Sequence, residues 1–297
     1  MIRPSILAKI LFGATFVLLL WGSVVHTTGS SLACPDWPLC YGQFFPTMKG
    51  GVLYEHGHRL IAAFVSILTV LLAVSIRQKY PEDRRLFYWA VGGIILVLTQ
   101  ALLGGLTVIY RLPDAISTAH LGTSMLFLAW TLAIQFRMHA GQNTLTALRI
   151  GPRVSRTKIA FAACAVYLQL IVGAVVRHTG SSFACGQDVL LCHGALIPST
   201  GPEWLHVSHR VLAFVVMALV IASTLKPLQW AKLHGHGRAR FFCIAAHALV
   251  LAQIGLGFLT VATSVNLHVV TTHLAFGALL WLDMVALFLT LGPLGCL

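Results

Sequence analysis

The sequence predicts an all-α integral membrane protein whose eight transmembrane helices form two tandem four-helix bundles. Three observations support this fold class. The chain is 58% hydrophobic and only 9% charged, with a mean hydropathy of +0.85, whereas soluble domains usually contain about 25% charged residues. Apolar stretches of roughly 20 residues, the length that a bilayer requires, recur along the chain. Finally, a set of motifs occurs twice in the same order.

The apolar stretches are predicted to be helices, because a backbone surrounded by lipid must satisfy its hydrogen bonds internally. The first stretch follows Arg3 and Lys9 and so resembles a signal peptide. Its counterpart in the repeat lies in mid-chain, however, and we expect both to be structural helices. The predicted helices cover about residues 9–28, 58–76, 86–109, 117–138, 157–177, 207–225, 240–262 and 270–292.

The distribution of basic residues predicts the topology. Of the 20 lysines and arginines, 15 lie at the N-terminus or in the regions after the second, fourth and sixth predicted helices. The positive-inside rule therefore places both termini in the cytoplasm and the protein in the cell (inner) membrane. This topology explains the net charge of +12, so we expect no nucleic-acid binding. The basic loops are suited to contact anionic lipid.

The internal repeat divides the chain into domains 1–138 and 157–297, joined by a cytoplasmic linker at 139–156. Each half has four predicted helices with short loops, which favours an up-down-up-down bundle. An even number of helices per repeat predicts halves related by a pseudo-two-fold axis along the membrane normal. The matching segments are 29–31 with 180–182, 55–59 with 206–210, 100–108 with 253–261, and 119–121 with 272–274.

Four histidines recur in matched pairs: His58 and His120 in the first half, His209 and His273 in the second. Each lies near the start of an alternate helix, so the two rings of a pair can face each other across a bundle. Two opposed imidazoles are suited to hold a haem iron; neutral imidazole also binds copper and zinc. Zinc is disfavoured because no third or fourth ligand is evident. A hydrogen bond to a neighbouring helix would explain one such histidine, but not two matched pairs.

The halves differ at one position beside these histidines. Glu55 precedes His58 by three residues and shares a helix face with it, whereas the second half has His206 at the position of Glu55. A carboxylate at the membrane edge is a candidate for proton transfer, although the helix macrodipole alone would favour an acid there. Arg59 and Arg210 suit a carboxylate partner such as a haem propionate, or else extend to the membrane interface.

Glycines in the third and seventh predicted helices allow two interpretations. They could let a flat ligand approach the backbone, or they could serve close helix packing. These residues are Gly104, Gly105, Gly255 and Gly257. The sequence assigns no role to His26, His56 or His206.

Two pairs of cysteines lie in equivalent loops: Cys34 with Cys40, and Cys185 with Cys192. The predicted outer side of the membrane is oxidising, so a disulfide within each loop is plausible. We favour a structural role for these bonds over a redox-active one that relays electrons.

The matched halves, the run Cys34-Pro-Asp-Trp-Pro-Leu-Cys40, the Glu55-x-x-His58-Arg59 motif, and His120, His209-Arg210 and His273 together resemble the haem A synthase family. The resemblance covers essentially the whole chain. It implies oxidation of a methyl group of haem O to a formyl group, giving haem A for aa3-type terminal oxidases.

By this resemblance, His58 and His120 lie near the iron of the substrate haem O, and His209 and His273 hold a haem B cofactor. Glu55 matches the essential glutamate of the family, and the four loop cysteines match one of its branches. Two hydroxylations of the methyl group would give a diol that loses water; alternatively, electrons are removed from the ring. Partners implied by the resemblance are a haem O synthase and the terminal oxidase. The oligomeric state stays open.

Three rival functions fit parts of the pattern. A di-haem electron carrier explains the four histidines but not Glu55 in one half only. A thiol–quinone oxidoreductase would use the cysteine pairs, but it predicts closer cysteine spacing and needs no histidine pairs. A transporter would place its polar residues near the bilayer midplane, whereas here they gather at one edge.

Overall fold

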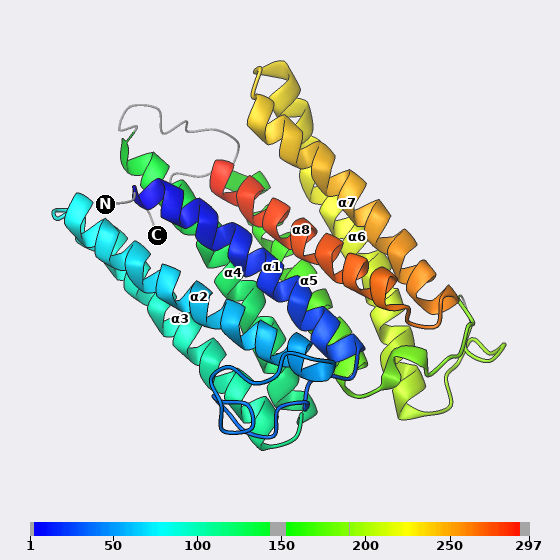
Figure 1. Ribbon diagram of the computed structural model, residues 1–297. Helices are drawn as coiled ribbons and strands as arrows, with labels where there is room; N and C mark the ends of the chain where they lie inside the picture. Colours follow the sequence, from blue (N-terminus) through cyan, green and yellow to red (C-terminus); the bar gives the residue numbers. More distant parts are fainter. Residues whose placement is uncertain (1–2, 143–152, 190, 292–297) are drawn as a thin grey trace. The chain divides into compact units, whose positions relative to one another are not determined.

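The computed structural model describes residues 3–142, 153–189 and 191–291. Within these ranges the structure is helical and has no strands (Figure 1). The elements are α1 (Pro4–Thr27), α2 (Gly51–Lys79), α3 (Arg84–Ile109), α4 (Asp114–Gln142), α5 (Arg153–His178), the short η1 (Ser181–Phe183), α6 (Gly201–Leu233), α7 (Gly237–Ala262) and α8 (Leu267–Thr290).

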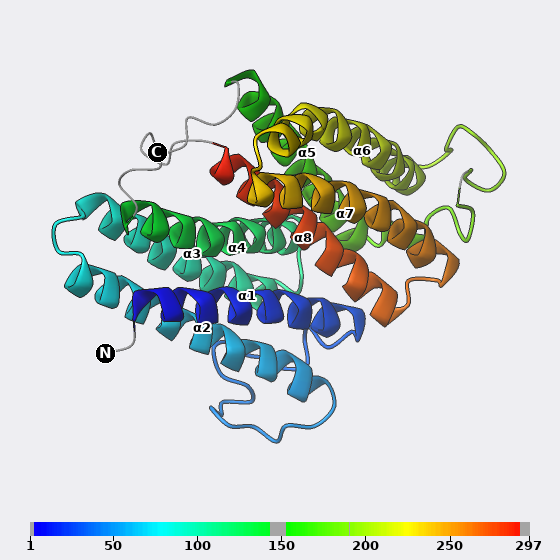
Figure 2. The same cartoon turned by 90° about the horizontal axis from the view of Figure 1, so that it is seen from above.

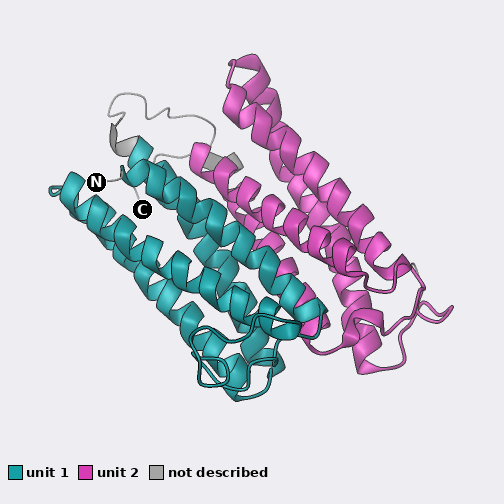
Figure 3. Cartoon of the chain, in the orientation of Figure 1, with its two compact units in different colours: residues 1–142 teal, residues 143–297 magenta. Residues whose placement is uncertain are grey.

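All eight α-helices are long and apolar enough to cross a membrane. The predicted fold class is therefore confirmed, and the chain is a multi-pass membrane protein. The polypeptide divides into two compact units, Met1–Gln142 and Asn143–Leu297 (Figure 3). The predicted linker at 139–156 lies mostly outside the described residues; at its edges, α4 extends to Gln142 and α5 begins at Arg153.

Each unit is a closed ring of four antiparallel helices (Figures 1 and 2). In the first unit α1 packs on α2 and α4, and α3 packs on the same two helices; in the second, α5 and α7 each pack on α6 and α8. The helices that carry the paired histidines, α2 with α4 and α6 with α8, are therefore diagonal neighbours. This is the relation expected from the up-down order.

All eight α-helices of the described residues begin earlier than the hydropathy predicts, and the difference is largest for α2, which begins at Gly51 rather than 58, and α6, which begins at Gly201 rather than 207. Thr200 and Glu203 form a capping box that starts α6. Before α2, Gly50 has a φ of 54°, a conformation that glycine adopts without steric cost. These early starts place Glu55, His58 and their counterparts inside regular helix, where their spacing fixes which residues share a face.

Each unit also has a long loop at one end, and we call residues 28–50 the first cap loop and residues 179–200 the second. The apolar core of the first unit lies mainly toward the opposite end of its bundle, where α1 and α3 begin and α2 and α4 end. The core includes Leu7, Leu11, Leu72, Ile76, Leu86, Ala90, Trp130 and Ile134. Packing therefore stabilises one end of the bundle, and the polar residues gather at the cap-loop end.

Candidate functional site

Glu55 is the buried acidic residue at the cap-loop end of the first bundle. It lies in the second turn of α2, and its side chain is only 6% exposed. Oε2 accepts a hydrogen bond from the backbone N–H of Cys34 at 2.8 Å, and Oε1 accepts one from Nη2 of Arg59 at 2.7 Å. Both oxygens thus have specific donors. The donors are the backbone N–H of Cys34 and the side chain of Arg59, not the free N–H groups at the start of α2. The helix macrodipole alone therefore does not explain the position of this carboxylate.

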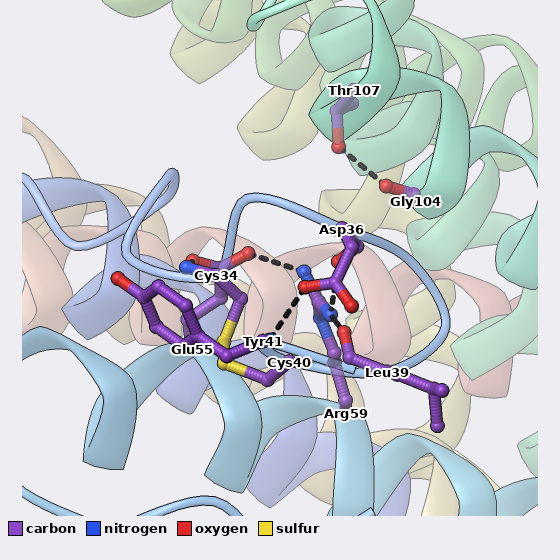
Figure 4. Close-up of polar contacts among 9 residues, drawn as sticks. All are labelled: Cys34, Asp36, Leu39, Cys40, Tyr41, Glu55, Arg59, Gly104 and Thr107. Atoms are coloured by element: carbon purple, nitrogen blue, oxygen red, sulfur yellow. Dashed lines mark hydrogen bonds and ion pairs between the residues drawn. A yellow bond between two sulfur atoms is a disulfide. The ribbon is translucent and has the colours of Figure 1, made fainter. Parts of the chain in front are cut away.

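Arg59 joins Glu55 to the first cap loop (Figure 4). Its Nη2 pairs with Glu55, while Nη1 donates to the backbone oxygens of Asp36, at 2.7 Å, and of Leu39. A guanidinium can hold several acceptors at once because its donors are fixed in a planar fork. The arginine therefore fixes the loop and the carboxylate to each other.

The turn of the first cap loop is shaped by Asp36. This exposed carboxylate accepts hydrogen bonds from the backbone N–H groups of Tyr41, at 2.6 Å, and Gly42, at 2.8 Å. The hydrogen bond from Gly42 is the main cause that holds the pKa of Asp36 below its ordinary value. The second cap loop repeats the device, since Asp188 accepts from the N–H of Gly194 at 2.7 Å.

The second bundle has no acid at the position of Glu55. Its counterpart, His206, is buried, and the nearby Glu203, one turn earlier, accepts from the backbone N–H groups of Ser199 and Thr200 as a helix cap. Arg210 donates through Nη1 to the backbone oxygens of Val189 and Leu191, each at 3.1 Å. Among the described residues, the buried Nε and Nη2 of Arg210 have no hydrogen-bond partner.

The paired histidines lie on the diagonal helices of their bundles: His58 on α2 and His120 on α4, and His209 on α6 and His273 on α8. All four rings are half-buried. Nδ1 of His120 and Nδ1 of His273 are buried, and neither has a hydrogen-bond partner in the described parts of the chain.

Each of the four histidines packs against a glycine on the neighbouring helix. A Cβ at Gly22 would lie 3.1 Å from Nε2 of His58, and one at Gly104 would lie 3.3 Å from Cε1 of His120. In the second bundle, the corresponding distances to Cε1 are 2.9 Å from Gly173 to His209 and 3.5 Å from Gly257 to His273. The missing side chains make room for the imidazoles.

These contacts refine the prediction for the glycines. Gly104 and Gly257 accommodate histidine rings, and Gly105 accommodates Trp37 of the first cap loop, whose ring lies 2.9 Å from where a Cβ would be. A Cβ at Gly255 would meet nothing within 4 Å. Gly22 and Gly173 were not predicted to be site residues, although their spacing of 151 residues, equal to that of His58 and His209, was a signal in the sequence.

Glutamines also contact the histidine-bearing helices. Gln100 on α3 donates to the backbone oxygen of His120 at 3.1 Å. Gln169 on α5 contacts His209 twice, with its Nε2 at 3.1 Å from Nδ1 and at 2.9 Å from the backbone oxygen. The position equivalent to Gln169 in the first bundle is Leu18, which packs against the apolar core. This difference between the two bundles was not predicted from the sequence.

Each cap loop contains a disulfide, as predicted. Cys34 is bonded to Cys40 and Cys185 to Cys192, with Cα–Cα distances of 4.8 and 4.6 Å. All four residues are at least 97% buried. His56 lies beside the first bond and has its Nε2 2.8 Å from the backbone oxygen of Phe44, so it helps to fix the first cap loop on α2.

Comparison with known proteins identifies the family. Residues 5–285 match the model of the COX15-CtaA family, described as cytochrome oxidase assembly protein. The chain belongs to this family. It is 31% identical over 264 residues to a Heme A synthase of Symbiobacterium thermophilum, covering 86% of this chain and 84% of that protein. It is also 31% identical to a Heme A synthase of Macrococcus caseolyticus, covering 90% and 91% of the two chains.

Proposed function

We propose that this chain oxidises haem O to haem A, with haem O bound as substrate in the first bundle and haem B bound as cofactor in the second. The reaction follows from the family, since the curated relatives are named Heme A synthase, and the chain is accordingly a membrane oxidoreductase. These relatives give no support to an electron carrier without substrate chemistry. The assignment of the two bundles is the one that the family resemblance implies, and the geometry of the two sites supports it.

The observation that carries the assignment is the difference between the two arginines. In the first bundle Arg59 is occupied by Glu55 and by the first cap loop. In the second bundle Arg210 keeps two buried nitrogens without a partner in the described residues, and His206 replaces the acid. The first bundle therefore carries a fixed reactive group. The second offers donors to a bound anion.

The second bundle's residues fit a haem. His209 and His273 lie on diagonal helices, are half-buried and are accommodated by glycines, so the two imidazoles would hold the haem iron between them. A haem propionate would accept hydrogen bonds from the buried Nε and Nη2 of Arg210, which have no partner among the described residues. When bound, haem B supplies one-electron transfer.

Glu55 is the group that we assign to the substrate's methyl carbon. Oxidation of a methyl to a formyl group replaces two C–H bonds of that carbon with a C=O bond, so that an oxygen atom is added and protons and electrons leave. Glu55 accepts hydrogen bonds from both Cys34 and Arg59, which favours a role as proton acceptor or as a fixed negative charge over a role as proton donor. The buried disulfide and Arg59 keep the carboxylate in place by fixing the loop that supplies one of its donors.

The topology completes the proposal. The cap loops, with their disulfides, lie on the outer side of the cell membrane, and both termini lie in the cytoplasm, as the distribution of basic residues predicts. Haem O reaches the first bundle from a haem O synthase, and haem A leaves for a terminal oxidase. The four cap-loop cysteines act structurally, because their burial limits access by redox partners.

The proposal is tested by identifying the haems in purified variants made with a haem O source. We expect His209→Ala and His273→Ala to lose haem B, and His58→Ala and His120→Ala to keep haem B but stop haem A formation. Haem content is measured by extraction, chromatography and mass. Loss of haem B from the His58 variant with retention in the His209 variant would reverse the assignment.

A further inference from the structure

Gln169 and Gly173 lie four residues apart on α5 and so share a helix face. Both contact His209: Gly173 accommodates the edge of the ring at Cε1, and Gln169 approaches Nδ1 at 3.1 Å. The Oε1 atom of Gln169 is buried and has no hydrogen-bond partner among the described residues. These two contacts with α5 therefore determine the orientation of the His209 ring.

The first bundle has a glycine at the position equivalent to Gly173 but no glutamine at the position equivalent to Gln169. Leu18 and Gly22 on α1 occupy the equivalent positions, and a leucine has no polar atom to offer His58. The two rings also present different edges to their glycines. His58 turns Nε2 and Cδ2 toward Gly22, whereas the atom of His209 closest to Gly173 is Cε1, followed by Nδ1 and Nε2.

We infer that Gln169 is a positioning residue that makes His209 a permanent ligand, and that Leu18 leaves His58 free to be displaced from the substrate's iron. This inference rests on the proposed function of the two bundles. When Nε2 of an imidazole binds a metal, Nδ1 carries the ring proton and needs an acceptor. If the side-chain amide of Gln169 rotates so that Oε1 and Nε2 exchange places, Oε1 accepts the hydrogen bond from Nδ1–H of His209. The hydrogen bond from Nε2 to the backbone oxygen of His209 is then lost.

The difference suits the two roles. A cofactor ligand must stay on its iron through every cycle, and a partner on the second ring nitrogen increases metal affinity, typically by 10- to 100-fold. A substrate ligand must release its iron when haem A leaves the bundle. His58 has no such partner, because Leu18 occupies the position equivalent to Gln169. His58 therefore dissociates from its iron more easily than His209 does.

The test compares Gln169→Leu and Gln169→Glu, with Gln135→Leu as a matched control for loss of a glutamine from a spanning helix. Gln135 bonds the backbone oxygen of Thr131 on its own helix and lies about four turns along α4 from His120. We expect Gln169→Leu to retain haem B about 10- to 100-fold less tightly and to raise its reduction potential. Gln169→Glu should lower the potential, because a carboxylate acceptor makes the imidazole more basic. Gln135→Leu should change neither.

Potentials are measured by redox titration and ligation by electron paramagnetic resonance. A purely structural role would reduce haem content without shifts of opposite sign, and that result would overturn the inference, as would an unchanged spectrum in Gln169→Leu. The reverse variant, Leu18→Gln, should retain haem O more tightly and form haem A more slowly; unchanged retention would also count against the inference. If the unaltered protein contains no haem B, the proposed function fails first.

Discussion

The cap-loop ends of the two bundles share a framework but differ in what it carries. Both have a disulfide, an aspartate-stabilised turn, and an arginine that bonds two backbone oxygens of its loop. In the first bundle that arginine also pairs with Glu55, whereas in the second His206 replaces the acid and two nitrogens of Arg210 have no partner among the described residues. The repeat therefore shares one scaffold, and a few side chains distinguish the site that we propose to be reactive from the site that we propose to hold the cofactor.

The largest effect that would break this comparison is loss of Glu55. We expect Glu55→Gln to reduce haem A formation by at least about 100-fold, the contribution of a positioned proton-transfer group, and to leave haem B content unchanged. Glu203→Gln is the matched control, since Glu203 is a buried acid of the second bundle that caps the start of α6 and lies 3.9 Å from Nε2 of His193, and its loss should cost about 1 kcal/mol of stability. Comparable haem A yields from the two variants would remove the functional distinction between the bundles.

The next effect concerns Arg210. Arg210→Met removes two donors that we assign to a haem propionate, and a hydrogen bond to a charged group contributes about 1.5–3 kcal/mol. We expect haem B to bind about 10- to 100-fold more weakly, as measured by haem retention during purification. The haem-free protein should also lose some thermal stability, because Nη1 of Arg210 bonds the backbone oxygens of Val189 and Leu191; the loss should be larger with haem bound, because Nε and Nη2 have no other partner in the described chain. Equal destabilisation with and without haem would indicate a structural arginine.

The glycines sharpen the comparison at the histidines. Gly173→Ala would place a Cβ 2.9 Å from the ring of His209, whereas Gly255→Ala meets nothing within 4 Å and serves as the control. Overpacking of this kind costs about 1–3 kcal/mol, so we expect the first variant alone to lose haem B, as measured by its absorption spectrum. Full haem B content in Gly173→Ala would show that the ring needs no such space.

The disulfides give the smallest difference. Closing a loop of this size contributes about 2 kcal/mol in either bundle, so thermal unfolding should detect similar losses in Cys34→Ser/Cys40→Ser and Cys185→Ser/Cys192→Ser. Only loss of the first disulfide should also impair haem A formation, because that bond fixes the loop whose backbone N–H at position 34 donates to Glu55. The contrary observation would be equal activity in the two double variants.

The sequence by itself determined the fold class, because hydropathy and helix periodicity are local properties that lipid makes decisive. It also revealed the repeat, because matching residues of the two halves lie at a nearly constant spacing. The repeat in turn identified the four histidines, the two cysteine pairs, and Glu55 as an acid that has no acidic counterpart in the second half. The diagonal relation of the histidine pairs followed from the order of the helices. None of these inferences needed the path of a loop.

Only the tertiary structure decided which partners these residues have. Glu55 meets Cys34 across 21 residues, and Arg59 meets the backbone of the first cap loop, through contacts that depend on how an irregular loop folds back on α2. The unpaired nitrogens of Arg210 and the contact of Gln169 with His209 depend likewise on packing between helices. Such contacts join residues distant in sequence, and no local periodicity encodes them.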